Sequence, residues 1–514
     1  MVAVTSYFVG VDWNNDGDYS DTGENVSTDI MSDSAVAIAY GRDTARALSP
    51  TMAGTGAFEL RNDTLKYSPD NAGSAMYGNL VPGRPVIVQA TYGGTTYTLF
   101  HGFIDDYTVL PSKSDQKVQV SCIDQIARFA YVQISTYLYQ GVRTGTAVGH
   151  ILDAVGWTGG RDLDPGATYI RWWWEQGTDA LTALNKLIGA EGPPAICFID
   201  GATGNFCFRD RHHRLLRTVS NTSQATFHGT TTEPIISEPV TYDAGWKNIV
   251  NQVQVTCTAY DPAATTVIWS SSGNVGATVD PETGTPVIAG AITNTITIAD
   301  SSTYTITAVA NGPFTGAAAP LAGIDFQQVY GTTTASISWN SGLAVTITLT
   351  DAGGGSAITG LQMRGNLINT TYQIQLTNQD NTSIAEYGVR GLSGVDMSWC
   401  GPDDAAAIST LLLNRYAQRR PIITFALNNV SATRLTQLLA RDLSDRITVI
   451  INNLDFNADC FIETIGYSIS NGQTLITATF GCEKAPTDSA NAQTNPFTFD
   501  AATNGKFNTG AFGW

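Results

Sequence analysis

The stretch from 251 to 375 constrains the fold most strongly, because apolar and polar residues alternate along it in several successive runs. In one run Val345, Ile347 and Leu349 are separated by single threonines. This period of two places apolar side chains on one face of a strand and polar ones on the other. The glycine-rich turn at 353–355 follows that run. Together these features predict an antiparallel sandwich or barrel, and we interpret residues 251–375 as a β-sandwich.

The rest of the chain combines strands with a few helices. Before residue 135, short β-branched or aromatic runs at 85–88, 97–100 and 118–122 predict strands between turns. Apolar residues at helical spacing predict four helices, one over 148–155, one capped by Asp179, one beginning near Pro402 and one capped by Ser431. The predicted fold class is therefore mainly β with a few helices (α+β).

The length of the chain indicates several domains, because 514 residues are too many for one hydrophobic core. The shifts in pattern predict a β-rich first domain over 1–135, a mixed α/β connecting domain over 136–250, the sandwich over 251–375, helices and strands of a second β-rich domain over 376–485, and a flexible tail over 486–514.

The balance of charge excludes one broad class of function. The chain has 27 Lys and Arg residues against 45 Asp and Glu, for a formal net charge of −18. Phosphate binding relies on cationic side chains, so we expect neither nucleic-acid binding, sequence-specific or general, nor binding to an anionic membrane. Charged residues make up 14% of the chain, well below the usual quarter. That composition suits a protein that buries surface against other subunits, with a large all-β monomer as the alternative.

Seven cysteines are spread along the chain without a CxxC pair. Several lie in strand-like runs, as Cys122 does, so we expect buried thiols that act as small apolar groups instead of disulfides or a zinc site. Cys197 and Cys207 flank a predicted hairpin at 197–208 and are the only candidate pair. We expect no secretory signal, and no membrane span, because no apolar run approaches about 18 residues.

The strongest local motif is an acidic loop near the N-terminus that matches the start of an EF-hand calcium loop, with oxygen ligands at its odd positions and Gly17 at the sixth. The predicted ligands of a structural calcium ion are Asp12, Asn14, Asp16 and Asp18. The twelfth position is Gly23, so the bidentate acid is missing, and Glu24 or Asp21 would replace it only with altered geometry. The alternative is an Asx-rich turn without a metal. No other cofactor is expected.

No catalytic motif accompanies this loop. The sequence has five histidines but no HExxH, GxSxG, Gly-Lys-Ser/Thr or GxGxxG pattern, so we predict that the chain is not an enzyme. The basic cluster at 209–217 is predicted to be a solvated strand end and turn, or alternatively a grip on a partner's carboxylates. The aromatic run at 171–174 is predicted to serve core and subunit packing, with sugar stacking as the alternative.

Two blocks of motifs resemble a known family. The first contains Gly41-Arg42-Asp43, Phe58-Glu59-Leu60-Arg61-Asn62-Asp63 and Tyr77-Gly78-Asn79-Leu80-Val81-Pro82-Gly83-Arg84-Pro85-Val86, and continues through 99–105 and 118–124. The second begins with Ser383-Ile384-Ala385-Glu386-Tyr387-Gly388-Val389-Arg390 and continues through 403–420 and 443–449. In this order the motifs resemble the minor tail and tail-hub proteins of long-tailed bacteriophages, including baseplate hub and late-control-D-type proteins.

The resemblance implies two tube-like antiparallel β-barrel domains, the first over 1–135 and the second completed by 376–485, with the sandwich as an insertion. Three copies would supply six barrels, so that a homotrimer has pseudo-six-fold symmetry. The implied role is structural: a ring at the virion's tail tip that closes the tail tube. Its implied neighbours are a distal tail protein or the tail tube above and tip or fibre proteins below. DNA and a tape-measure protein would pass through the lumen, and synthesis is expected in the host bacterial cytoplasm.

Three other functions remain open from the sequence. The first is a hexameric distal tail ring component, which differs from the hub in copy number. The second is a glycan-binding adhesin that uses the 251–375 sandwich or the tryptophan run. The third is a cell-wall hydrolase, although no appended lytic motif is present. The aromatic residues of the 486–514 tail are expected to order on a neighbouring tail protein.

Overall fold

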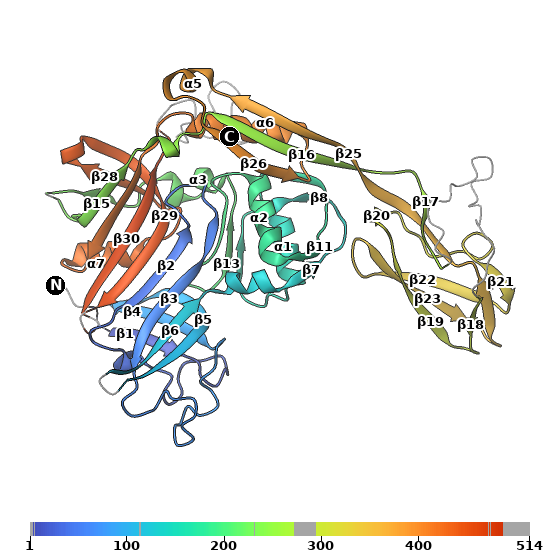
Figure 1. Ribbon diagram of the computed structural model, residues 1–514, viewed down its shortest axis with the longest axis horizontal. Helices are drawn as coiled ribbons and strands as arrows, with labels where there is room; N and C mark the ends of the chain where they lie inside the picture. Colours follow the sequence, from blue (N-terminus) through green and yellow to red (C-terminus); the bar gives the residue numbers. More distant parts are fainter. Residues whose placement is uncertain are drawn as a thin grey trace.

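The structure is a computed structural model that describes residues 4, 6–112, 115–230, 232–271, 295–470, 472 and 474–486. Strands dominate these residues, with thirty strands against seven α-helices, which confirms the mainly β class. Figure 1 shows a body of blue and red strands, a mixed lobe beside it, and an arm that reaches away from both. The predicted tail, 486–514, lies outside the described residues from 487 onward.

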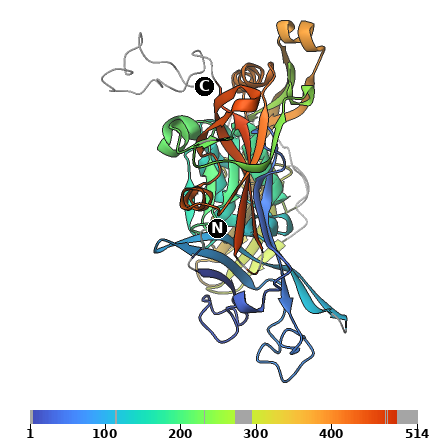
Figure 2. The same ribbon diagram turned by 90° about the vertical axis from the view of Figure 1, so that its left-hand side faces the viewer.

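A sheet of twelve strands forms the body. Ten strands follow one another in the order β1 (Ser6–Val11), β4 (Pro85–Tyr92), β5 (Thr95–Ser112), β6 (Asp115–Ile123), β3 (Thr51–Arg61), β2 (Val36–Arg42), β29 (Phe456–Ser470), β30 (Leu475–Lys484), β27 (Ile422–Asn428) and β15 (Ser237–Asp243). Beside this path, β28 (Arg446–Ile451) pairs with β29, and β14 (Thr226–His228) pairs with β28. Figures 1 and 2 both show the blue and red strands as neighbours in this layer.

The first and last parts of the chain join at one seam in this sheet. There β2 pairs antiparallel with β29, from Val36 opposite Ile469 to Gly41 opposite Thr464. Both groups of strands also share one hydrophobic core. The two separate closed barrels expected from the resemblance are therefore not confirmed, since the hydrogen bonds of the described strands trace a single open sheet that ends at β1 and β15. Each of the two strand groups would have an exposed edge at β2 or β29. Pairing these two strands with each other gives their backbone N–H and C=O groups hydrogen-bond partners.

The lobe packs helices on small sheets around a second core. Its helices are α1 (Thr144–Ala154), α2 (Ala180–Glu191) and α6 (Pro402–Tyr416). Its sheets pair β8 (Tyr139–Arg143) with β10 (Tyr169–Trp173), β7 (Gln133–Ser135) with β11 (Gln176–Asp179), and β12 (Ile196–Ile199) with β13 (Phe206–Arg209) and β9 (Arg161–Leu163). Apolar side chains of α1, α2 and α6 at helical spacing are buried, as the sequence pattern predicts.

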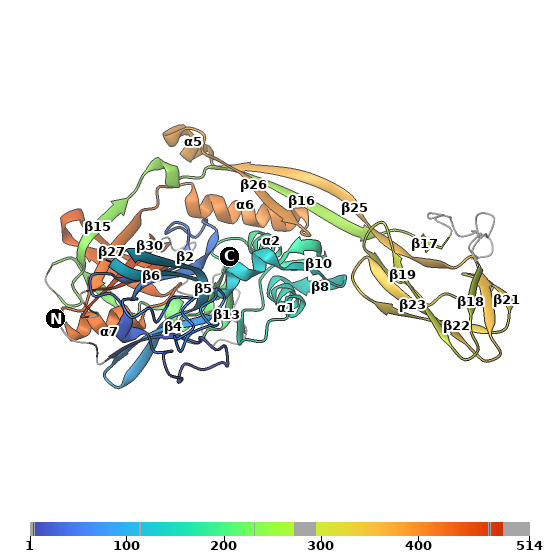
Figure 3. The ribbon, with the colours of Figure 1, turned by 60° about the horizontal axis from the view of Figure 1, so that its bottom comes forward.

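The arm begins as a long ribbon of two antiparallel strands, β16 (Gln252–Pro262) and β25 (Gln362–Gln379). Near the lobe, β16 also pairs in parallel with β26 (Gly391–Ser398), and α6 packs on β16 and β25, as Figure 3 shows. A short helix, α5 (Asn381–Tyr387), follows β25. The ribbon thus roots the arm in the lobe through three adjacent strands.

The far end of the arm has its own core. One sheet has the strand order β18 (Thr295–Ile298), β24 (Ser356–Thr359), β21 (Gln327–Tyr330). A second sheet has the order β19 (Thr303–Val309), β23 (Ala344–Asp351), β22 (Thr333–Trp339). Two shorter strands, β17 (Thr266–Ser270) and β20 (Phe314–Thr315), pair with β25. The alternation read from the sequence holds in β23, where Val345, Ile347 and Leu349 are fully buried in the third hydrophobic cluster. This distal core shares no buried residue with the other two clusters.

Two further predictions concern cysteines and membrane spans. All seven cysteines are free and buried, which confirms the expectation of apolar thiols. Cys197 lies opposite Phe208 and Cys207 opposite Phe198, so the candidate pair is offset in its hairpin. Among the described residues, no helix combines the length and the apolar character that a membrane span requires.

Candidate functional site

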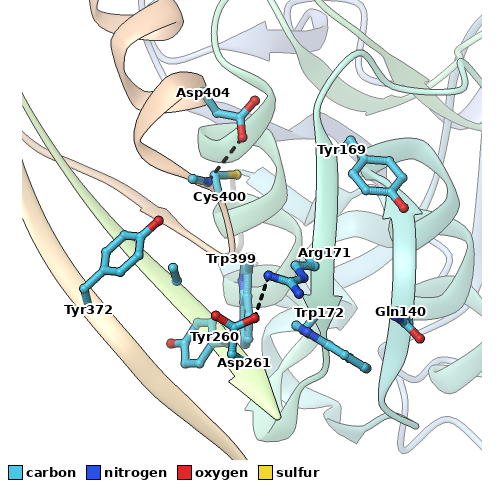
Figure 4. Close-up of a pocket in the computed structure, with 12 residues that line it drawn as sticks. Gln140, Tyr169, Arg171, Trp172, Tyr260, Asp261, Tyr372, Trp399, Cys400 and Asp404 are labelled. Carbon is cyan, nitrogen blue, oxygen red and sulfur yellow. Dashed lines mark hydrogen bonds and ion pairs between the residues drawn. The ribbon is translucent and has the colours of Figure 1, made fainter.

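A pocket of about 450 Å³ lies where the arm leaves the lobe. Figure 4 shows its walls, which come from β8 and β10 of the lobe, from β16 and β25 of the ribbon, and from the turn between β26 and α6. Five aromatic rings line it, those of Tyr169, Trp172, Tyr260, Tyr372 and Trp399. Aromatic walls with a few polar groups are typical of small-molecule binding sites.

The polar groups of this pocket are only partly satisfied. Arg171 forms an ion pair with Asp261 at 2.5 Å between Nη1 and Oδ1, on the exposed side of the pocket. The indole N–H groups of Trp172 and Trp399 are buried and have no acceptor among the described residues. A buried donor without an acceptor costs stability, and neither nitrogen is open to the pocket.

Trp399 adopts an unusual backbone conformation at this pocket, with a φ of +85°. Bulky residues rarely occupy this left-handed region, so its surroundings must hold it there. Its ring lies 4.4 Å from that of Trp174 and 5.5 Å from that of Tyr260, measured between centroids. The aromatic cluster of Trp174, Tyr260 and Trp399 thereby connects the lobe to the ribbon.

The three tryptophans of the predicted aromatic run lie in different surroundings. Trp173 is fully buried, and its ring stacks on Tyr139 at 5.8 Å. Trp174 packs in the aromatic cluster, while Trp172, 5% exposed, lines the pocket. Packing within the chain therefore accounts for two of the three rings, and sugar stacking remains open for Trp172 alone.

The predicted calcium loop leaves β1 and folds back on itself. Both carboxylate oxygens of Asp12 accept backbone N–H groups, from Asp16 at 3.1 Å and from Gly17 at 3.0 Å. The amide of Asn14 donates to Asp16 and to Asp21, and Asp18 accepts from the backbone of Ser20. The pKa of Asp18 is lowered, mainly by that backbone hydrogen bond.

Of the four predicted ligands, Asp12 and Asp16 come together with a third acid, Glu24. Carboxylate oxygens of these three residues all lie within 4.8 Å of one another, while Asp18 does not belong to this group of acids. Burial raises the pKa of Glu24, and the charges of Asp12, Asp21 and Asp16 raise it further. The sequence pattern left Glu24 and Asp21 as alternatives for the missing acid, and of these two the fold brings Glu24 into the group.

The basic cluster at 209–217 differs from its predicted solvated state. Arg214, in α3 (His213–Leu216), is 1% exposed, and its Nη1 lies 2.8 Å from Oε1 of Glu463. Arg209 pairs with Asp162 at 2.7 Å, and Arg217 lies 3.3 Å from Asp164. The prediction of a solvated turn is thus wrong for Arg214, because an acid distant in the sequence supplies a buried partner.

Solved structures similar to the chain include phage tail proteins and a component of a type VI secretion system. A tail protein from Neisseria meningitidis has a TM-score of 0.47 at 10% identity and covers 93% of this chain and 97% of that chain. The 43 kDa tail protein of prophage MuSo2 from Shewanella oneidensis has a TM-score of 0.45 at 10% identity, with the same coverage. A prophage tail protein from Listeria monocytogenes has a TM-score of 0.43 at 9% identity and covers 93% of this chain and 94% of that chain.

These neighbours belong to the class of proteins that the sequence motifs resemble. At such low identity and TM-scores the likeness is distant, and no function is transferred through it. No protein-family model matches the sequence, and no curated protein matches it closely enough to count as a relative.

Proposed function

We propose that the chain is a structural hub protein of a bacteriophage tail tip and that three copies form a ring. The main observation in support is the seam between β2 and β29, which places the first and last strand groups of one chain side by side. Three such chains around an axis would present six strand groups, the number that matches a six-fold tube. The order of the tail-hub motifs in the sequence supports the same assignment.

Two features of the chain support a ring-forming role. Among the described strands, the twelve-stranded sheet ends at β15, which pairs with β27 on one side only, and such an edge strand needs a cover or a partner. The net charge of −18 suits a lumen through which DNA passes without sticking. In this proposal closure into tube-like walls takes place between copies, and the ring is located in the virion tail.

The proposed neighbours are a distal tail protein or the tail tube on one side and tip or fibre proteins on the other, with a tape-measure protein in the lumen. The role is structural and requires no reaction. The far end of the arm, with a core of its own, would be the part free to contact a neighbouring protein.

Measuring the mass of the purified protein tests the copy number. A trimer has three times the 54.7 kDa of one chain, and negative-stain images should show a three-fold ring with a central hole. Six copies would favour the alternative of a hexameric distal tail ring. A monomer at every concentration, without ring-shaped particles, would contradict both.

A second candidate function is glycan binding at the tail tip, favoured by the pocket at the root of the arm. Its five aromatic rings suit the apolar face of a sugar. A glycan array with the intact protein tests this function. Binding that survives Trp172→Ala unchanged would exclude a role for this ring, and no binding to any glycan would exclude the function.

A further inference from the structure

We propose that Asp12, Asp16 and Glu24 bind a calcium ion that fastens the N-terminal loop to the edge of the main sheet. The inference is independent of the proposed hub function. Its geometric basis is the convergence of three carboxylates, whose oxygens lie within 4.8 Å of one another. Like charges held this close repel, and a divalent cation is the ligand that offsets such a charge.

A second observation points to the ion. Glu24 is 2% exposed, and its Oε1 has no hydrogen-bond partner among the described residues. Its other oxygen, Oε2, accepts from the backbone of Asp21 at 3.1 Å. No Lys, Arg or His in the described part of the chain forms an ion pair with Asp12, Asp16 or Glu24. A buried carboxylate oxygen without a partner is costly, and a cation would satisfy it.

The arrangement favours calcium over magnesium. Calcium takes six to eight oxygen ligands in flexible geometry, whereas magnesium demands a compact octahedron. Two of the acids come from one end of the loop and the third from its other end, and one of them, Asp16, is exposed. Such a site leaves room for water to complete the larger coordination shell. Glu24 would then supply the acid that the linear motif lacks at Gly23.

The ion would hold residues 24–26 against the edge of the main sheet. The carbonyl of Glu24 accepts the N–H of Val11 at 2.9 Å, and the N–H of Val26 donates to Val9 at 2.9 Å. Residues 24–26 therefore cover the outer edge of β1, the end strand of the twelve-stranded sheet. An ion bridging Asp12 and Glu24 would tie this cover to the strand it protects.

Isothermal titration calorimetry of the full chain, first stripped with EDTA, tests the site with calcium chloride and separately with magnesium chloride. We expect one calcium per chain, weaker magnesium binding, and a higher melting temperature in calcium. Glu24→Gln and Asp16→Asn should each weaken calcium binding by about 10- to 100-fold or more. Loss of a group that only supports a metal ligand lowers metal affinity by that factor, and loss of a ligand should cost at least as much. Because Asp16 is exposed, Asp16→Asn tests the site without disturbing buried packing.

The matched control is Asp33→Asn, which removes an exposed acid that lies outside the cluster. It should bind calcium and gain thermal stability as the wild type does. The proposal is overturned if the wild type shows no saturable calcium binding. It is equally overturned if folded Asp16→Asn and Glu24→Gln proteins bind calcium with the wild-type affinity.

Discussion

Glu463 of β29 forms an ion pair with Arg42 of β2, 421 residues away, at 2.9 Å between Oε2 and Nε. Arg214 lies against the other oxygen of the same carboxylate at 2.8 Å, as an ion pair without hydrogen-bond geometry. All three side chains are at most 2% exposed. Arg42 also donates to the carbonyls of Pro194 and Ala195. One carboxylate thereby links the seam of the sheet to the lobe.

Replacing that carboxylate should be costly. Glu463→Gln leaves Arg42 and Arg214 as buried charges without compensation, so we expect the free energy of unfolding to fall by about 3–5 kcal/mol. Urea denaturation at pH 7 measures the change. Asp153→Asn is the control, since its carboxylate is 63% exposed in the pair with Arg161, and should cost about 1 kcal/mol or less. Equal losses in the two variants would refute this role of Glu463.

Buried acids that resist ionisation should contribute less to stability as pH rises from about 4 to about 7. The pKa of Asp442 is raised from 3.8 to about 7, chiefly by burial and then by the charge of Asp200. In this range the unfolded chain has released the proton that the folded chain retains, so each pH unit favours unfolding. Burial would also raise the pKa of Glu483, but Arg415 and Arg420 outweigh it and lower that pKa to about 2. Glu483 therefore acts below this range and in the opposite direction.

Asp442→Asn removes the titrating group from this position. We expect the variant to gain about 1–2 kcal/mol over the wild type between pH 5 and pH 8, roughly half of the unscreened linkage energy. Urea denaturation of both proteins at several pH values measures the difference. Acids that do not interact with Asp442 titrate equally in both proteins and cancel, whereas Asp200 and Asp445 interact with it. A constant difference across this range would show that Asp442 ionises normally in the folded chain.

The aromatic cluster, more than the ion pair beside it, should fix the arm to the lobe. Trp174→Ala removes a ring 4.4 Å from Trp399 and 5.1 Å from Tyr260, and should cost about 2–3 kcal/mol, below the loss for a fully buried tryptophan. Arg171→Ala breaks a pair whose side chains are 65% and 39% exposed and should cost about 1 kcal/mol or less. Urea denaturation gives both values, and limited proteolysis should cleave the ribbon faster only in Trp174→Ala. The reverse order of effects would make the ion pair the main fastening.

The distal unit should be removable. Pro262 lies opposite Ile368 in the ribbon, so residues 263–367 can be replaced by an Asn-Gly turn that closes β16 and β25 as a hairpin. The deletion removes the hydrogen bond from the N–H of Gly342 to the carbonyl of Thr136 in the lobe, at 2.7 Å. Because the distal core is nevertheless separate from the other two, we expect the shortened protein to melt at nearly the same temperature as the body of the full chain. Calorimetry and mass measurement check this, and the copy number should match that of the full chain. A shortened protein that aggregates or unfolds would show that the body depends on the arm.

Much of the local structure could be predicted because its signals are local. Asp179 caps α2 by accepting the N–H of Thr182 at 2.8 Å, and Ser431 caps α7 (Ala432–Ala440) by accepting that of Arg434 at 3.2 Å. In each case the capping side chain and the apolar stripe that follows are neighbours in the sequence. The helix near Pro402 is also predictable from local sequence, because a proline occupies its first turn, where proline favours the start of a helix.

Long-range relationships were beyond the reach of such patterns. Val36 pairs with Ile469, yet many strands of this chain carry the same alternation, so nothing in either strand names its partner. Arg214 stands in a run whose composition is that of a solvated turn, and only Glu463, on a distant strand, explains its burial. Glu24 lies one residue past the calcium pattern, and only the fold of the loop brings it to Asp12 and Asp16.

The ribbon that carries the arm enters and leaves the lobe on adjacent strands. The backbones of β16 and β25 are therefore about 4.8 Å apart where they join the lobe, which is the spacing of paired strands. Any globular unit whose own termini emerge as a strand pair could be joined to these two strands, at the loss of the hydrogen bond from Gly342 to Thr136 of the lobe. Recombination between related genes would then exchange the distal unit of the arm while the twelve-stranded sheet keeps its sequence.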